Sequence, residues 1–206
     1  MGTVSIPHTG LSDRIVTVPN VLSVVRLLFI PLFLYLFLVL RADGWALAIL
    51  LTSGATDWLD GKLARVLDQS SRIGALLDPL VDRLSVVTTL LAFVVRGIIP
   101  WWVAAILIGR DLILAATLLI YRRRGLPPPE VIYLGKAATF VIMIALPVLL
   151  GSTGDSTIAQ ILAPIGYALI IWGTGLYIWT GALYTYKAMG IARAVPRTSD
   201  RSARDA

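Results

Sequence analysis

The chain alternates between long apolar stretches and short polar segments. Residues 21–40 form the first stretch, in which Arg26 is the one charged position. About 20 apolar residues in a helix span the roughly 30 Å hydrocarbon core of a bilayer. Five more helices of comparable length are expected at 45–67, 73–95, 100–121, 131–150 and 158–186. The pattern predicts an all-α membrane protein with six transmembrane helices.

The first expected helix begins with polar residues. Pro19 and Asn20 precede the apolar stretch, and Asn20 is the expected N-cap. Arg26 lies one to two turns further along. Its guanidinium group either reaches back to the lipid headgroups or points into a polar cavity, and the sequence leaves both alternatives open.

The distribution of basic residues predicts the orientation. Six spans place both ends of the chain on one side, together with the 68–72 turn and the segment 122–124. This side carries nearly all of the lysines and arginines, whereas the 151–157 loop on the other side has none. The positive-inside rule therefore makes the termini cytoplasmic. The expected organisation is a tail at 1–18, a membrane domain at 19–188 and a basic tail at 189–206.

The amino-acid composition limits the kinds of chemistry and partners that the protein can have. Hydrophobic residues make up 57% of the chain and charged residues 15%, a balance typical of membrane proteins. Cysteine is absent and His8 is the only histidine, which excludes disulfides, thiolate catalysis and His-based triads. The net charge of +6 comes from residues that border apolar stretches, so it favours anionic lipid headgroups as partners over nucleic acid.

Four carboxylates stand at the junction between the second and third expected helices. Asp57 and Asp60 are three residues apart, and Asp78 and Asp82 are four apart, so each pair shares one helix face. Brought together, the four charges would repel one another unless divalent cations lay between them. Oxygen ligands of this kind suit Mg²⁺, Mn²⁺ or Ca²⁺ and not Zn²⁺.

The run from Asp57 to Asp82 reads D-x2-D-G-x2-A-R-x8-G-x3-D-x3-D. It resembles the complete signature of the CDP-alcohol phosphatidyltransferase family, and P-N-x-L-S-x-x-R at 19–26 is similar to the family as well. The resemblance implies a six-helix fold in the bacterial inner (plasma) membrane, with a cytoplasmic-side active site between helices two and three. It also implies an enzyme in which an alcohol hydroxyl displaces CMP from CDP-diacylglycerol.

The resemblance further implies roles for the residues of the run. Asp57, Asp60 and Asp78 would bind metal, and Asp82 would combine metal binding with the role of general base. Two Mg²⁺ or Mn²⁺ ions are expected. The residues expected to bind the CDP moiety are small or cationic: Gly61, Ala64, Arg65 and Gly74.

The acceptor is predicted from helices four and five. Arg110-Asp111 and Lys136-x-x-Thr139 look more like the cardiolipin synthases of the family, which use phosphatidylglycerol, than like phosphatidylglycerophosphate synthases, which use glycerol-3-phosphate. The latter typically carry a second lysine, where this chain has Ala138. An Ala138→Lys change is therefore expected to improve use of glycerol-3-phosphate, which remains the alternative acceptor. The expected acceptor-binding residues are basic: Arg110, Lys136, Arg122, Arg123 and Arg124.

Further expectations concern assembly and competing functions. The resemblance implies a homodimer packed through helices three and four, where Gly97, Ala104, Ala105, Ala115 and Ala116 are small enough for close contact. Aromatic residues of the last helix favour a lipid-facing anchor over a ligand cage: Trp172, Tyr177, Trp179, Tyr184 and Tyr186.

An ion transporter is a remote alternative function, because acidic residues within a membrane often mark ion pathways. Here, however, the acids are confined to 26 residues.

Overall fold

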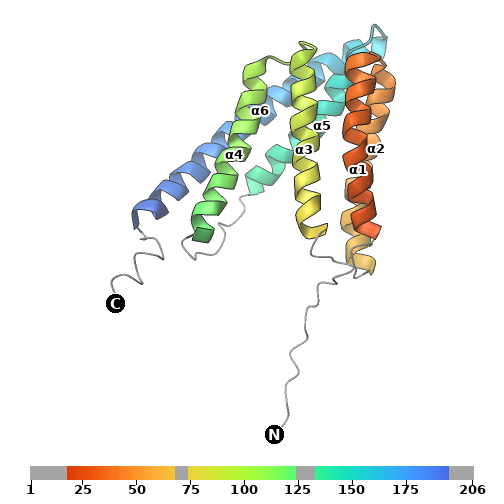
Figure 1. Ribbon diagram of the computed structural model, residues 1–206. Helices are drawn as coiled ribbons and strands as arrows, with labels where there is room; N and C mark the ends of the chain where they lie inside the picture. Colours follow the sequence, from red (N-terminus) through yellow and green to blue (C-terminus); the bar gives the residue numbers. More distant parts are fainter. Residues whose placement is uncertain (1–17, 68–73, 124–132, 195–206) are drawn as a thin grey trace. The chain divides into compact units, whose positions relative to one another are not determined.

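The computed structural model describes residues 18–67, 74–123 and 133–194, and its regular elements within these ranges are all helical (Figure 1). The expected all-α architecture is confirmed. The elements are α1 (Val18–Leu34), a π-helical turn η1 (Tyr35–Val39), α2 (Asp43–Leu67), α3 (Gly74–Val95), α4 (Trp101–Arg123), α5 (Tyr133–Gly151) and α6 (Thr157–Ala194).

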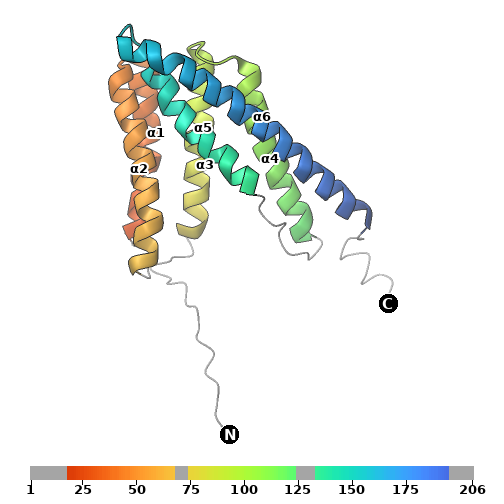
Figure 2. The ribbon, with the colours of Figure 1, turned by 180° about the vertical axis from the view of Figure 1, so that it is seen from behind.

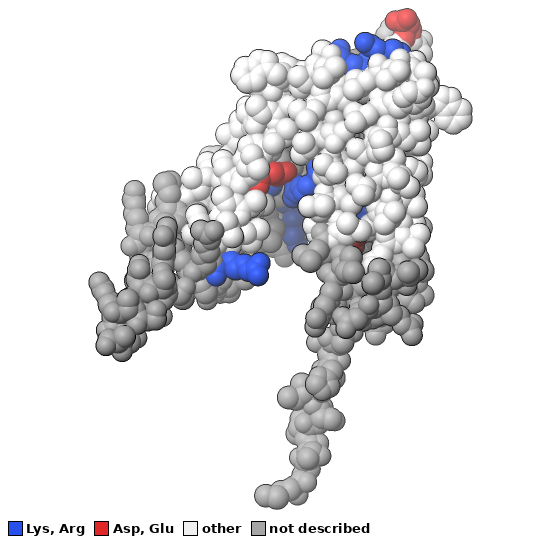
Figure 3. Space-filling model, in the orientation of Figure 1, with Lys and Arg blue, Asp and Glu red and all other residues white. Residues whose placement is uncertain are grey.

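Four of these helices are long and apolar enough to cross a membrane. The candidate spans are Asn20–Val39, Trp101–Arg122, Tyr133–Gly151 and Thr157–Lys187. The other two described helices, α2 and α3, carry the acidic residues, which lower their apolarity. Charged side chains cover little of the described surface seen in Figure 3, whereas many large apolar side chains are exposed. The protein is an integral membrane protein.

The described helices form two compact units, Met1–Thr89 and Leu90–Ala206, and α3 contributes to both. In the first unit α1 packs along α2, side by side in both ribbon views (Figures 1 and 2). Phe33, Phe37, Ala46 and Val81 are buried. The helices of this unit therefore enclose an apolar core beyond their polar ends.

The start of α1 differs from the expectation. Asn20 lies inside the helix and is buried, so its expected role as N-cap is wrong. Pro31 lies further along α1, and the π-turn η1 follows. Arg41 follows the helical segment formed by α1 and η1. Its φ of 54° lies in the left-handed region, where few residues other than glycine are found.

In the second unit α6 packs against α4 and α5. A Cβ added to Gly173 would lie 2.5 Å from Cδ1 of Ile142, and one added to Gly166 would lie 2.9 Å from Cδ2 of Leu149. Glycine therefore allows α5 and α6 to approach closely, as in other membrane helix pairs.

Two helix ends in the second unit have recognisable caps: the C-terminus of α3 and the N-terminus of α6. Gly97, with a φ of 71°, ends α3: its N–H donates to Val94 O and the Ile98 N–H donates to Phe93 O, the two bonds of a Schellman motif. At the start of α6 the Ser156 Oγ accepts a hydrogen bond from the Ala159 N–H, which makes Ser156 an N-cap.

Helix α6 is longer than predicted. It has 38 residues, about 57 Å at 1.5 Å per residue, and continues past the expected end at residue 186. The prediction stopped where Lys187 ended the apolar stretch, but the residues that follow include good helix formers such as Ala188 and Ala192. Loss of apolarity marks the end of a membrane span and does not by itself end a helix.

Candidate active site

Three of the predicted acids lie around one arginine in the first unit. The Arg26 Nη1 donates hydrogen bonds to Oδ1 of Asp57, at 2.7 Å, and to Oδ1 of Asp82. The Arg26 Nη2 lies 3.5 Å from Oδ1 of Asp78. The end of α2 and the first turns of α3 are thus joined through a side chain of α1, as the clustering predicted from the sequence requires.

The arginine and the acids differ in exposure. Arg26 is 2% exposed, whereas the side chains of Asp57, Asp78 and Asp82 are 38%, 35% and 44% exposed. A buried charge is costly unless it is paired, and the carboxylates provide that pairing for Arg26. Because the acids are also partly exposed, a cation from outside can approach them.

Helix α1 contributes a polar face to this cluster. Asn20, Ser23 and Arg26 recur at every third position and are all buried, and the Ser23 Oγ donates a hydrogen bond to Oδ1 of Asp78. Of the two alternatives for Arg26, the structure selects the polar surroundings over the lipid headgroups. Ser23 and Arg26 were missed as site residues, although their spacing in an apolar helix is a signal that could have identified them.

The remaining residues of the run lie mostly outside the described side chains. The backbone of α2 includes Asp60, Gly61, Ala64 and Arg65, and α3 begins at Gly74, but their side-chain positions are not described. The 68–72 break falls outside the described residues. The roles expected for these five residues stay predictions.

The chemistry of the cluster fits a hard divalent cation. Among the described residues, no three acidic or histidine side chains form a set arranged to hold a metal ion; the three described acids surround Arg26 instead. They offer only carboxylate oxygens and converge on a positively charged group. Such a donor set matches Mg²⁺ or Mn²⁺ in kind.

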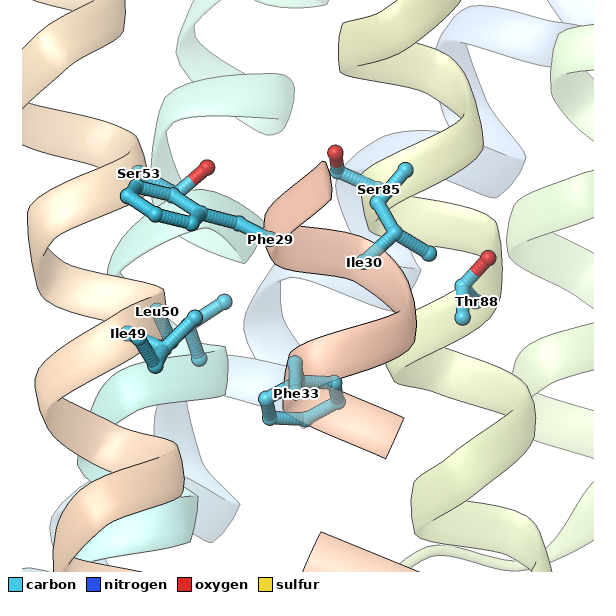
Figure 4. A pocket seen from close by; sticks show the side chains of 8 residues that line it. All are labelled: Phe29, Ile30, Phe33, Ile49, Leu50, Ser53, Ser85 and Thr88. Atoms are coloured by element: carbon cyan, nitrogen blue, oxygen red, sulfur yellow. The ribbon is translucent and has the colours of Figure 1, made fainter. Parts of the chain in front are cut away.

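An apolar pocket lies next to the cluster (Figure 4). Its lining comes from α1, α2 and α3: Phe29, Ile30, Phe33, Ile49, Leu50, Ser53, Ser85 and Thr88. Phe29 and Ile30 follow Arg26 by one helical turn, Ser53 precedes Asp57 by one turn, and Ser85 follows Asp82 by three residues. The pocket therefore begins about one helical turn from the carboxylates.

A second arginine is buried in the other unit. Arg110 of α4 is 5% exposed, and its Nη1 donates a 3.0 Å hydrogen bond to Oδ1 of the adjacent Asp111. Its Nε is buried and makes no hydrogen bond among the described residues. The guanidinium carbon lies 4.6 Å from the ring centre of Tyr177 and 5.9 Å from that of Tyr184, within the range of cation–π attraction.

Helix α5 completes the surroundings of Arg110. A Cβ added to Gly135 would lie 3.2 Å from Nη2 of Arg110, so the backbone of α5 approaches the guanidinium closely. The hydroxyl of Tyr177 donates to Oγ1 of Thr139, at 3.4 Å, and Thr139 in turn donates to Gly135 O. Residues of all three helices thus enclose this arginine.

These contacts correct the expectation for the aromatic residues of α6. Trp172, Trp179 and Tyr186 are 68%, 61% and 76% exposed, as a lipid-facing anchor requires, but Tyr177 and Tyr184 are 2% and 3% exposed. The two sets each repeat every seven residues, which places them on two different faces of one helix. Only the set of Trp172, Trp179 and Tyr186 faces outward, whereas Tyr177 and Tyr184 face the interior of the unit.

The expected acceptor-binding residues are not all brought together. Lys136 is exposed, and its Nζ lies 5.8 Å from the ring centre of Tyr133. Arg122 is exposed and lies twelve residues beyond Arg110 on α4, about 18 Å along the axis. The side chain of Arg123 and all of Arg124 are outside the described part.

The position of the absent second lysine is packed inside the second unit. Ala138 is 0% exposed and lies on the same face of α5 as Gly135 and Ile142. A lysine at this position would bury an ammonium group or displace its neighbours. Ala138→Lys is therefore an unsuitable test of acceptor preference, because loss of stability would mask any change in activity.

Sequence comparison identifies the class of protein to which this site belongs. The pattern of the CDP-alcohol phosphatidyltransferase family matches residues 16–172, which include α1 to α5, the complete acidic run and the first 16 of the 38 residues of α6. The chain belongs to the CDP-alcohol phosphatidyltransferase family, and the predicted resemblance is confirmed.

Individual relatives are similar along most of their length. A Streptomyces coelicolor protein named cardiolipin synthase (CMP-forming) is 47% identical over 188 residues, which cover 89% of this chain and 87% of the relative. A Mycobacterium tuberculosis protein, provisionally named a cardiolipin synthase, is 46% identical over 94% of this chain and 93% of its own. A Pseudomonas fluorescens CDP-diacylglycerol–glycerol-3-phosphate 3-phosphatidyltransferase is 34% identical over 81% of this chain and 87% of its own.

Proposed function

We propose that this protein is a CMP-forming cardiolipin synthase, which transfers the phosphatidyl group of CDP-diacylglycerol to a hydroxyl of phosphatidylglycerol. The proposal rests on one observation. The guanidinium group of Arg26 contacts three acids, and these acids belong to a complete family signature: Asp57, Asp78 and Asp82. The relatives at 46% and 47% identity support phosphatidylglycerol as the acceptor.

The four acids would hold Mg²⁺ or Mn²⁺. Two such ions would neutralise negative charge on the diphosphate of the donor. Arg65 would pair with that diphosphate through its planar guanidinium group. Gly61, Ala64 and Gly74 would leave room for the CDP moiety against the helix backbones. Together these residues would bind the donor with its phosphorus accessible to the acceptor.

Asp82 would act as the general base. Its carboxylate accepts the proton of the acceptor hydroxyl, and the hydroxyl oxygen forms a bond to the phosphatidyl phosphorus of the donor. The bond from that phosphorus to the bridging oxygen breaks, and CMP leaves with the electron pair.

Arg110 would bind the phosphodiester of phosphatidylglycerol. Among the described residues its guanidinium group contacts one carboxylate and two aromatic rings, and its Nε has no hydrogen-bond partner. Such a group retains capacity for an anion. Lys136 and the arginines at 122–124 would contribute attraction for anionic lipid near the membrane surface.

The arrangement in the membrane is proposed as follows. All six helices cross the bilayer, since α2 and α3 have 25 and 22 residues and about 20 suffice. The termini and the acids face the cytoplasm, and the protein forms a homodimer. Ala104 is buried within its own unit and cannot contribute to a dimer contact, whereas Ala105, Ala115 and Ala116 are exposed.

The proposal is tested with purified protein in nanodiscs, CDP-diacylglycerol and Mn²⁺. One reaction receives phosphatidylglycerol and the other glycerol-3-phosphate, and released CMP is measured. CMP release that depends on phosphatidylglycerol and stops with EDTA is expected. Release with glycerol-3-phosphate alone would assign the alternative acceptor, which the relative at 34% identity represents, and no release with either would leave a transporter as the better description.

A further inference from the structure

The contacts of Arg26 have a consequence for metal binding. Its guanidinium group uses the Oδ1 atoms of Asp57, Asp78 and Asp82. In the family signature these three carboxylates are the expected metal ligands. One side chain of the protein therefore contacts an oxygen atom of each carboxylate that a divalent cation would also need.

The surroundings hold Arg26 in this position. The side chain is buried on α1, and Ser23, one turn before it, donates a hydrogen bond to Asp78. A guanidinium group carries several N–H donors in a fixed plane and can bridge two carboxylates at once. The Nη1 of Arg26 does so between Asp57 and Asp82. The contacts of Arg26 with the acids are therefore held in place by the neighbouring side chains.

Charge explains how the site can accept a metal ion as well. Among the described side chains of the cluster, three carboxylates meet a single guanidinium group, so negative charge is in excess there. The acids are each about two-fifths exposed, whereas Arg26 is buried. A divalent cation can thus reach the acids without first displacing the arginine from the interior.

We propose that Arg26 is an internal counter-cation that competes with divalent metal for Asp57, Asp78 and Asp82. In the absence of metal it offsets part of the negative charge of the acids and holds α2 and α3 to α1. Binding of metal would weaken the contacts from Arg26 to the shared carboxylates, and this lowers the affinity for the ion. The inference rests on the proposed role of the three acids as metal ligands, and Arg26 is a positioning residue within it.

The test uses the full chain in mild detergent, stripped of metal with EDTA and titrated with MnCl₂ by calorimetry. Arg26→Gln removes the competing charge and should bind Mn²⁺ at least about tenfold more tightly than the unmodified protein, since like charges interact strongly in a site of low dielectric. Without metal, Arg26→Gln should unfold at a lower temperature, and Mn²⁺ should raise that temperature more than it does for the unmodified protein.

The matched control is Arg41→Gln. It removes the same charge from the same unit, but Arg41 is exposed and lies 15 residues beyond Arg26, about 22 Å along a helix axis. Its Mn²⁺ affinity should stay within about twofold of the unmodified protein, as expected for a distant exposed charge. Arg26→Lys, which keeps the charge but not the planar fork, should have an affinity between those of the unmodified protein and Arg26→Gln.

The outcomes separate this inference from the proposed function. If the unmodified protein binds Mn²⁺ and Asp57→Asn weakens that binding, the metal site stands; unchanged or weaker binding by Arg26→Gln then overturns the counter-cation role alone. If the unmodified protein binds no Mn²⁺, both are overturned. Should Arg26→Gln be unfolded in EDTA, refolding on addition of Mn²⁺ supports the inference, and failure to fold in either condition contradicts it.

Discussion

Among the described residues two arginines are buried in apolar helices, and they are paired in opposite ways. Arg26 lies among three carboxylates from two other helices. Among the described residues Arg110 lies beside one carboxylate, of its own helix, and also contacts two aromatic rings and the glycine position of α5. The described side chains thus place three carboxylates around the first arginine and one beside the second.

This difference underlies the opposite ligands that we propose for the two regions. An excess of carboxylate charge favours binding of a divalent cation. A guanidinium group with one carboxylate partner among the described residues favours an anion such as a lipid phosphate. A buried arginine in a membrane protein is interpreted from the charge and number of its partners, because burial alone is common to Arg26 and Arg110.

The largest expected effect is at the acid cluster. Asp82→Asn removes the proposed base while keeping the shape of the side chain, and should lower the rate of CMP release by about 10²- to 10⁴-fold. Asp155→Asn, in an exposed loop of the second unit, should leave the rate unchanged. Near-normal turnover of Asp82→Asn at saturating Mn²⁺ would remove Asp82 from the mechanism.

The next effect is expected at the second arginine. Arg110→Gln removes the proposed phosphate ligand and should raise the KM for phosphatidylglycerol more than about tenfold, the usual range for losing a charge-assisted hydrogen bond. The KM for CDP-diacylglycerol should change little. Equal increases for both substrates, measured in mixed micelles, would indicate a general loss of structure instead of a role in acceptor binding.

A stability change tests the packing that brings α6 to Arg110. Gly173→Ala should lower the stability of the protein by about 1–3 kcal/mol, because the new methyl group overlaps Ile142. Gly175→Ala, which has open space around the added Cβ, should be neutral or stabilising. Thermal unfolding in detergent measures both, and Ile142→Val, which removes the overlapping methyl, should restore part of the loss.

The smallest effect is expected at the aromatic neighbours of Arg110. Tyr184→Leu removes one cation–π contact and should raise the KM for phosphatidylglycerol by about two- to tenfold. Tyr186→Leu changes an exposed tyrosine two residues away and should leave this constant unchanged. The same increase in both variants would show that the side of α6 facing Arg110 has no special role.

Most of the fold could be predicted from the sequence. The long apolar runs gave the helices to within a few residues, apart from the C-terminal part of α6, because the hydrophobic requirement of a membrane span is strong. The four acids could be identified from their spacing, and three of them do lie around one point. Asp60 lies outside the described side chains, so its place in the set is still a prediction.

The partners of the buried arginines were harder to predict. Arg26 and Ser23 stand in a recognised motif, but contact with the acids depends on how α1 is turned toward α2 and α3, which spacing along one helix does not determine. The aromatic residues of α6 were treated as one group, although the seven-residue repeats of Trp172 and Tyr177 mark two different faces. Separating the two repeats would have identified the buried pair.

A competition experiment decides whether the acceptor is a lipid. Purified protein in nanodiscs receives CDP-diacylglycerol, Mn²⁺ and equal amounts of phosphatidylglycerol and glycerol-3-phosphate, and the lipid products are identified by mass. Cardiolipin is expected as the main product, with CMP formed in equal amount. Accumulation of phosphatidylglycerophosphate without cardiolipin would instead assign glycerol-3-phosphate as the acceptor.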